Sequence, residues 1–206
     1  RMGASVVANG GQIVTNKALG IKRISIDTLK VQLQDTSIKG QKVVVAAGAW
    51  SKGLAQQVGD TLPLDTEQGY HLMYKGAEQL LNRPVGWADS GFYMTPMDEG
   101  LRAAGTVELA GLNNAANPKR LKLIAETMKT LLPQLKSHDS EWTGFRPSMP
   151  DSMPVISQSS NDAGIYFAFG HGHIGVTLSG ITGKLICEMI DGKTPSMDIA
   201  AFSAQR

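Results

Sequence analysis

A glycine-rich segment near the C-terminus, residues 169–177, has the composition best suited to binding a ligand. Its glycines, Gly170, Gly172 and Gly175, would let the backbone approach a flat or anionic ligand closely. The segment is predicted to lead from a buried strand into a helix, whose first turn adds unpaired N–H groups and a positive dipole end. A tight strand-to-helix turn, in which the glycines only relieve steric crowding, explains the same residues. Both interpretations stay open.

Arg146 is a candidate anion-binding residue because it stands directly before Pro147. The residue before a proline is biased toward an extended backbone, which could direct the guanidinium inward. A planar guanidinium suits a carboxylate through two parallel hydrogen bonds. The alternative is a structural salt bridge, for instance with Asp151. The spacing alone favours the salt bridge.

Tyr93 and Cys187 are two further side chains with possible chemistry. Strand alternation places Tyr93 on the face opposite Phe92 and Met94, as either a pocket residue or an ordinary sheet residue. Cys187 is the only cysteine and has apolar neighbours in a predicted helix, so we expect a buried, inert thiol.

The histidines do not predict a metal site. His171 and His173 are two residues apart, but a metal ion needs three or four ligands, and His71 and His138 are distant in the sequence. No helical His/Glu motif accompanies the pair. We therefore expect histidines that line a pocket or contact the backbone, and no metal.

Composition excludes several classes of protein. The chain has 206 residues, of which 42% are hydrophobic and 18% charged, with a formal net charge of +2. These values predict a folded domain and give no support for a nucleic-acid partner. One cysteine excludes an internal disulfide and fits a reducing compartment. We recognise no signal peptide and no apolar run near the ~20 residues of a membrane span. We expect a cytoplasmic protein, with peripheral association at the inner face of the membrane as an alternative.

Hydrophobic patterns predict a mixed chain of strands and helices. Residues 42–48 form a continuous apolar run ending in small residues, which is typical of a parallel strand covered on both faces. Such a strand end is a common ligand site in open α/β sheets. The remaining predicted elements are short strands and turns over 3–34, a helix over 51–58 capped by Ser51, antiparallel strands over 64–106, a helix from Asn117-Pro118 to near 132, a strand over 165–169 and a helix over about 177–191 ended by Gly192.

Six motifs stand in a fixed order along the chain: VVVAAGAWS at 43–51, GYH at 69–71, FYMTP at 92–96, LRAAGT at 101–106, GFRP at 144–147 followed by Asp151 and Pro154, and FGHGHIG at 169–175. Together they resemble the family of FAD-dependent amino-acid oxidases and dehydrogenases that includes D-amino acid dehydrogenase and glycine oxidase. The resemblance covers essentially the whole chain but only about the second half of a typical family member.

The resemblance implies a site for FAD and a small amino-acid substrate. Arg146 would hold the substrate carboxylate, and Tyr93 and His173 would line the substrate pocket. Gly48 and Trp50 would lie near the adenosine part of FAD. The flavin ring would lie along Gly170, His173, Ile174, Gly175, Val176 and Thr177.

The implied fold is α/β (α+β): part of an FAD-binding Rossmann-like domain together with a largely antiparallel substrate-binding sheet and its packed helices. Residues 1–63 and 149–206 would belong to the FAD-binding domain, and residues 64–148 to the substrate-binding sheet. We recognise no opening strand, glycine loop and helix with the Gly-x-Gly-x-x-Gly fingerprint that grips the FAD pyrophosphate. The N-terminal FAD-binding segment is thus expected to be missing from this chain, and apolar surface left exposed could lead to a homodimer through the sheet.

The implied reaction is hydride transfer from an amino acid, in particular a D-amino acid, to FAD, which gives an imino acid and then a 2-oxo acid. No catalytic base is assigned, and the electron acceptor stays open. One alternative is a dehydrogenase of secondary amines such as sarcosine or a hydroxyproline-like compound. Another is a folded fragment without activity, because the fingerprint segment is absent.

Overall fold

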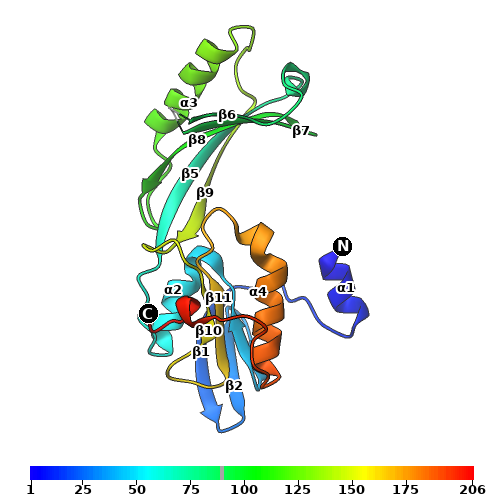
Figure 1. Cartoon of the computed structure of the whole chain (residues 1–206), viewed down its shortest axis with the longest axis vertical. Coiled ribbons are helices and arrows are strands. Elements are labelled where there is room, and N and C mark those ends of the chain that lie inside the picture. The colour runs from blue at the N-terminus through cyan, green and yellow to red at the C-terminus, as the bar shows by residue number, and fades with distance from the viewer. Residues whose placement is uncertain (89–90) are drawn as a thin grey trace.

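The chain forms two parts, which lie one above the other in Figure 1. The computed structural model describes residues 1–88 and 91–206. The strands β5 (Asp65–Tyr74) and β9 (Ser140–Ser148) run from the lower part into the sheet of the upper part, so they carry any side chain that lies at the junction.

The centre of the lower part is a three-stranded sheet with the order β10-β11-β4. Its strands are β10 (Val155–Gln158), β11 (Ile165–Phe169) and β4 (Val43–Val45). Strand β4 is parallel to β11, as predicted, and β10 is antiparallel to it. Only part of the apolar run at 42–48 is covered on both faces, because the side chain of Val44 is 40% exposed.

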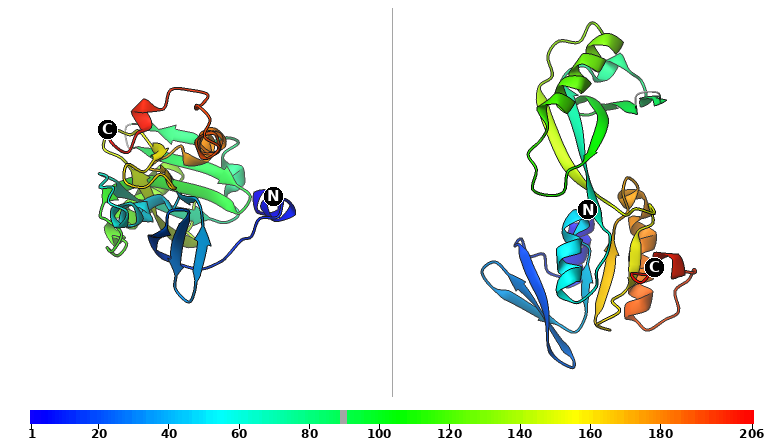
Figure 2. Two further views of the ribbon diagram at one scale, coloured as in Figure 1. Left: turned by 90° about the horizontal axis from the view of Figure 1, so that it is seen from below. Right: turned by 90° about the vertical axis from the view of Figure 1, so that its left-hand side faces the viewer.

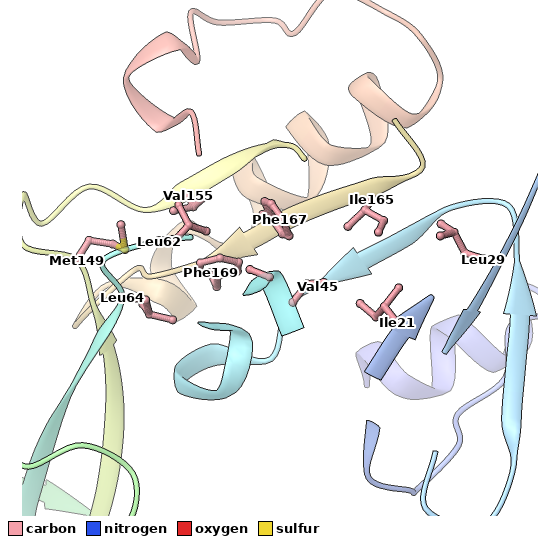
Figure 3. Packing of buried hydrophobic residues seen from close by; sticks show 11 residues of the cluster. Ile21, Leu29, Val45, Leu62, Leu64, Met149, Val155, Ile165, Phe167 and Phe169 are labelled. Atoms are coloured by element: carbon pink, nitrogen blue, oxygen red, sulfur yellow. The ribbon is translucent and has the colours of Figure 1, made fainter. Parts of the chain in front are cut away.

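Two layers pack on this sheet. On one face, Phe167 and Phe169 pack with Ile21, Leu29 and other residues of the core shown in Figure 3. This layer comprises β1 (Ala18–Ser25), β2 (Thr28–Leu33), β3 (Ser37–Gly40), the 3-10 turn Gly48–Trp50 and α2 (Ser51–Gln57). The other face is covered by α4 (Gly175–Ile190) and the 3-10 turn Ala200–Phe202. This arrangement places the N-terminal end of α4 beside the lower end of β9 (Figure 1).

The upper part is an antiparallel sheet of five strands in the order β6-β7-β8-β5-β9. Besides β5 and β9, it contains β6 (Val85–Trp87), β7 (Phe92–Met97) and β8 (Gly100–Leu109). Helix α3 (Pro118–Leu131) and the 3-10 turn Glu78–Leu80 cover one face, where Tyr70, Leu72 and Tyr74 pack against Ile124 and Met128. Figure 2 shows α3 on one side of this sheet only, and the alternate side chains of β5 lie on the open face.

The start of α3 agrees with the sequence prediction. The side chain of Asn117 accepts a hydrogen bond from the Lys119 N–H at 3.1 Å, and Pro118 occupies the first helical position. The helix also ends as predicted, at Leu131. Its N-terminus is tied to the sheet because the Asn117 N–H donates to the Tyr70 hydroxyl at 3.1 Å.

Loss of this cap gives a first testable result. We expect Asn117→Ala to lower the free energy of unfolding by about 1 kcal/mol, because alanine cannot accept the hydrogen bond from Lys119. Urea denaturation measures this change. Asn113→Ala, at an exposed position in the preceding loop, is the control and should change stability by less than about 0.5 kcal/mol. Equal losses in both variants would contradict a capping role.

Three details of the sequence prediction are wrong. Residues Met2–Ala8 form helix α1 rather than strands and turns, and none of them is buried. Ser51 is the first residue of α2 and is buried, but it makes no capping hydrogen bond. Cys187 is exposed, because the buried side of α4 carries Thr182, Leu185 and Ile186. A local pattern shows neither how much of a segment the rest of the chain covers nor whether a side chain makes its capping hydrogen bond.

None of the helices in the described part of the chain combines the length and the apolar character that crossing a bilayer requires.

Candidate functional site

Arg146 lies flat on the open face of the upper sheet. It is opposite Glu67 in the β5–β9 ladder, and its side chain extends across Gly69. A Cβ at position 69 would be 2.6 Å from Nη1 and 2.9 Å from Cζ of Arg146. Gly69 therefore makes room for the guanidinium. The predicted alternative, an ion pair with Asp151, is not formed, because Asp151 pairs with Arg206 at 2.7 Å.

Trp142 lies on the same face and, like Arg146, extends over a glycine. Its indole ring extends over Gly144, where any Cβ would collide with it. The ring stacks on His71, with centroids 4.8 Å apart and an angle of 17° between the planes. Since Trp142 is opposite His71 in the ladder, the stack extends across β5 and β9 beside the Arg146 guanidinium. Half of the tryptophan side chain is exposed, so the stack presents a flat aromatic surface.

Arg102 is the second arginine of this face. It is opposite Met73 on β5 and Thr95 on β7. Its Nε atom is buried and has no hydrogen-bond partner, and the same holds for Nη1 of Arg146. Burial, and then the charge of Arg146, lower the pKa of Arg102.

His71 is neutral at pH 7. Burial, and then the charge of Arg102, lower its pKa from 6.5 to about 4. Its Nδ1 atom is buried without a hydrogen-bond partner. A neutral imidazole adds no positive charge to the face and can accept a hydrogen bond.

The low pKa of His71 predicts a pH dependence of stability. An unfolded histidine titrates near pH 6.5, so the unfolded chain binds more protons than the folded chain between about pH 4 and pH 6.5. The stabilising contribution is complete above about pH 6.5 and is lost as the pH falls toward 4. His71→Gln should flatten this part of the curve of unfolding free energy against pH, measured by urea denaturation. His171, whose pKa burial also lowers, acts in the same direction and remains in both proteins. An unchanged slope in the variant would contradict the assignment.

Tyr93 also belongs to the open face. It is opposite Ala104 on β8 and Gly86 on β6, and its ring extends over Gly86, where a Cβ would be 2.9 Å from Cε1. The side chain is 62% exposed. The face thus has a cationic region at Arg102 and Arg146 and an aromatic edge at Tyr93.

The glycine loop between β11 and α4 contacts the lower ends of the same strands. The Gly172 N–H donates to the Pro147 carbonyl at 3.0 Å, and His171 forms an isolated bridge with Ser148. Nε2 of His173 is 3.5 Å from Oε2 of Glu67. These contacts enclose a hollow of about 210 Å³ at the junction of the two parts.

The glycines of this loop have a spacing that the sequence analysis missed. Gly170, Gly172 and Gly175 follow the pattern Gly-x-Gly-x-x-Gly, so the statement that this pattern is absent was wrong. It even lies between strand β11 and helix α4. The context nevertheless differs from a dinucleotide-binding unit, because the described chain after α4 contains a 3-10 turn and no second parallel strand. Gly170 and Gly172 have φ angles of +81° and +54°, so the glycines are required by backbone conformation.

The start of α4 fits a flat cofactor with an anionic edge. No side chain caps the helix, so its first N–H groups remain available. Ile174 and Val176 are exposed, Val176 by 92%, which leaves apolar surface beside these donors. A second hollow, of about 570 Å³, lies in the lower part and is lined by Trp50, Ala47 and Lys17 among others. Gly48 has a φ angle of +55° at its edge.

The structure brings together some of the predicted site residues. Arg146 and Tyr93 share the open face, and the imidazole of His173 lies next to the Glu67 carboxylate at one end of that face. Trp50 is at the other side of the junction, where its ring contacts Phe145 edge-on with centroids 6.1 Å apart. No role was predicted from the sequence for Arg102, His71 or Trp142. Strand alternation could have placed each of them on the Arg146 face, but only once the pairing of β5, β8 and β9 is known.

Solved structures of a glycine oxidase and an L-proline dehydrogenase share this fold. Glycine oxidase from Geobacillus kaustophilus superposes with a TM-score of 0.86 over 98% of this chain and 55% of that one, at 22% identity. L-proline dehydrogenase from P. horikoshii superposes with a TM-score of 0.82 over 98% of this chain and 57% of that one, at 19% identity. At these identities the likeness concerns the fold alone.

Sequence comparison identifies the family. The model of the FAD dependent oxidoreductase (DAO) family matches residues 2–189, so the chain belongs to this family. It is 39% identical over 205 residues to a D-amino-acid oxidase of Bradyrhizobium diazoefficiens, covering 97% of this chain and 49% of that protein. It is 29% identical to a glycine oxidase of Pseudomonas aeruginosa, covering 81% of this chain and 46% of that protein. The chain spans about half the length of the curated relatives it matches. The predicted family and the mixed α/β fold are confirmed.

Proposed function

We propose that the protein carrying this chain is an FAD-dependent oxidoreductase that oxidises an amino acid, with Arg146 as the residue that binds the substrate carboxylate. The observation that carries the proposal is the Arg146 guanidinium, which extends over Gly69 and has no ion-pair partner among the described residues. A guanidinium that is buried in part and left unpaired is suited to a ligand carboxylate. Membership of the family supplies the cofactor class.

The residues at the junction would hold FAD. We assign the flavin ring to Gly170, His173, Ile174, Gly175, Val176 and Thr177 at the start of α4, and the adenosine part to Gly48 and Trp50. When bound, FAD supplies the acceptor for the two electrons that leave the substrate. The dipole of α4 would favour negative charge at its N-terminus.

The chain's own residues would bind and orient the substrate. Arg146 fixes the carboxylate by two hydrogen bonds, which limits rotation of the substrate on the sheet. Tyr93 borders the same face and shields one side of the substrate from water. Orientation of this kind can lower an activation barrier by several kcal/mol, so no catalytic base needs to be assigned.

D-amino acids are the proposed substrate class. The support is the 39% identity to a protein named D-amino-acid oxidase. The alternative of a secondary amine is favoured by the likeness in fold to L-proline dehydrogenase. The second alternative, that the 206-residue chain by itself is inactive, follows from its span of about half the relatives' length.

A substrate panel tests the proposal. The purified full-length protein with FAD is mixed anaerobically with D-amino acids, their L-enantiomers, glycine, sarcosine and proline, and the loss of flavin absorption is followed. Reduction by primary D-amino acids supports the proposal. Reduction only by secondary amines would show that these amines, and not D-amino acids, are the substrates. If no compound of the panel reduces the flavin, the proposed function is rejected.

A further inference from the structure

We propose that Arg102 and Arg146 form one site for a substrate with two carboxylates, so that the preferred substrate is an acidic amino acid. Arg146 would bind the α-carboxylate and Arg102 the carboxylate of the side chain. This inference rests on the proposed function, because it assigns the substrate class of the same face.

The two arginines share the open face of the upper sheet, and each has a buried guanidinium nitrogen without a hydrogen-bond partner. Arg146 starts opposite Glu67 and Arg102 starts opposite Met73, six residues further along β5. At about 3.3 Å per residue, these rows are about 20 Å apart. The Arg146 guanidinium extends along the face to Gly69, two residues closer to the Arg102 row. Because each arginine has a buried nitrogen without a partner, a ligand with two anionic groups that spans the face would satisfy both.

Neither group is neutralised within the described part of the chain. Glu67 is the acidic side chain nearest to Arg146 in the ladder, but its carboxylate is directed to His173 at 3.5 Å. The neighbours of Arg102 on the flanking strands, Met73 and Thr95, are uncharged. The other part-buried arginines all have carboxylate partners: Arg23 with Asp162, Arg120 with Glu108 and Arg206 with Asp151. Arg102 and Arg146 thus stand apart from the other part-buried arginines of the described chain.

The surface between the two arginines suits a short, flat chain of carbon atoms. The stacked rings of His71 and Trp142 provide an apolar floor there. His71 is neutral near pH 7 and does not compete for the carboxylates. A substrate with an apolar side chain would cover Arg102 without pairing its charge, which is unfavourable. The site should therefore discriminate between acidic and neutral substrates, because discrimination is strong where a buried polar group would be left unpaired.

Binding of simple carboxylates tests the inference without any redox step. Isothermal titration of the full-length protein with glutarate and with butyrate compares two ligands of similar length that differ by one carboxylate. We expect glutarate to bind at least about tenfold more tightly than butyrate. Arg102→Met should remove this preference, because glutarate loses its second partner and butyrate no longer covers an unpaired charge. Arg102→Lys should restore part of the preference, and the exposed Arg83→Met should have no effect on it.

A spectroscopic signal separates direct binding from loss of structure. In NMR titrations, glutarate should raise the pKa of His71, because a carboxylate on Arg102 offsets the charge that lowers it. Equal affinities for the two ligands, or a preference that survives in Arg102→Met, would overturn the inference. The substrate panel reports on the proposed function separately. Reduction by neutral D-amino acids faster than by acidic ones would reject only the two-arginine site, whereas a glutarate preference without any flavin reduction would reject only the function.

Discussion

Replacing Arg146 with alanine is expected to weaken the binding of carboxylate ligands by at least about 100-fold. The variant loses two charge-assisted hydrogen bonds, each of about 1.5–3 kcal/mol. In the full-length enzyme, KM should rise and kcat should fall together, because the same contact both binds and orients the substrate. Arg146→Lys should recover only a small part of the affinity, since an ammonium cannot bind a carboxylate through a planar pair of donors.

Titration with butyrate and steady-state kinetics measure these effects. Arg83→Ala, which removes an exposed arginine outside the strands of the sheet, is the matched control and should leave both unchanged. Thermal unfolding of each variant excludes loss of the fold as the cause. An Arg146→Ala enzyme with normal KM and kcat would contradict the role given to Arg146.

Gly100→Ala is expected to lower the free energy of unfolding by about 3 kcal/mol or more. Gly100 begins β8 after the turn from β7 and has a φ angle of +138°, which a residue with a Cβ rarely adopts. The added Cβ would also collide with the Tyr74 carbonyl oxygen and lie 2.9 Å from the Lys75 Cα. Both neighbours are backbone atoms at the C-terminal end of β5, so they cannot move aside as a flexible side chain could. The variant should therefore disturb the pairing of β8 with β5 as well as the turn.

Gly180→Ala provides a control for which the opposite change in the free energy of unfolding is expected. Gly180 lies inside α4, is exposed, and has no atom near the position of an added Cβ. Alanine there should raise the free energy of unfolding by about 0.5–1 kcal/mol, because glycine is less favourable in a helix. Chemical denaturation of both variants measures the difference. A stable Gly100→Ala protein would mean that the turn can adopt another conformation.

Elements whose signals are local were predicted well from the sequence. Strand β11 and the cap of α3 agree with prediction, and α4 was predicted to start two residues late, because apolar runs, Asn-Pro and a following glycine are short-range patterns. Helix α1 was missed, since none of its residues is buried and no apolar stripe marks it. Cys187 was misplaced because the pattern of α4 has apolar residues on more than one side, and only packing decides which side is covered.

The candidate site depends on pairing between distant strands, which no single segment reveals. Arg146 was recognised as an anion-binding candidate, but the sequence favoured a salt bridge with Asp151, and only the structure gives that carboxylate to Arg206. Arg102 was part of a quoted motif without a role, because its place on the Arg146 face is known only once β8 and β9 flank β5. The space that Gly69 leaves for Arg146, and Gly144 for Trp142, likewise exists only after the sheet has formed.

The most direct test of the central claim is the visible absorption spectrum of the full-length protein with FAD, before and after anaerobic addition of a D-amino acid. The account predicts flavin bands that are shifted relative to free FAD and that bleach when the amino acid is added. A spectrum identical to that of free FAD, unchanged by any amino acid, would contradict it.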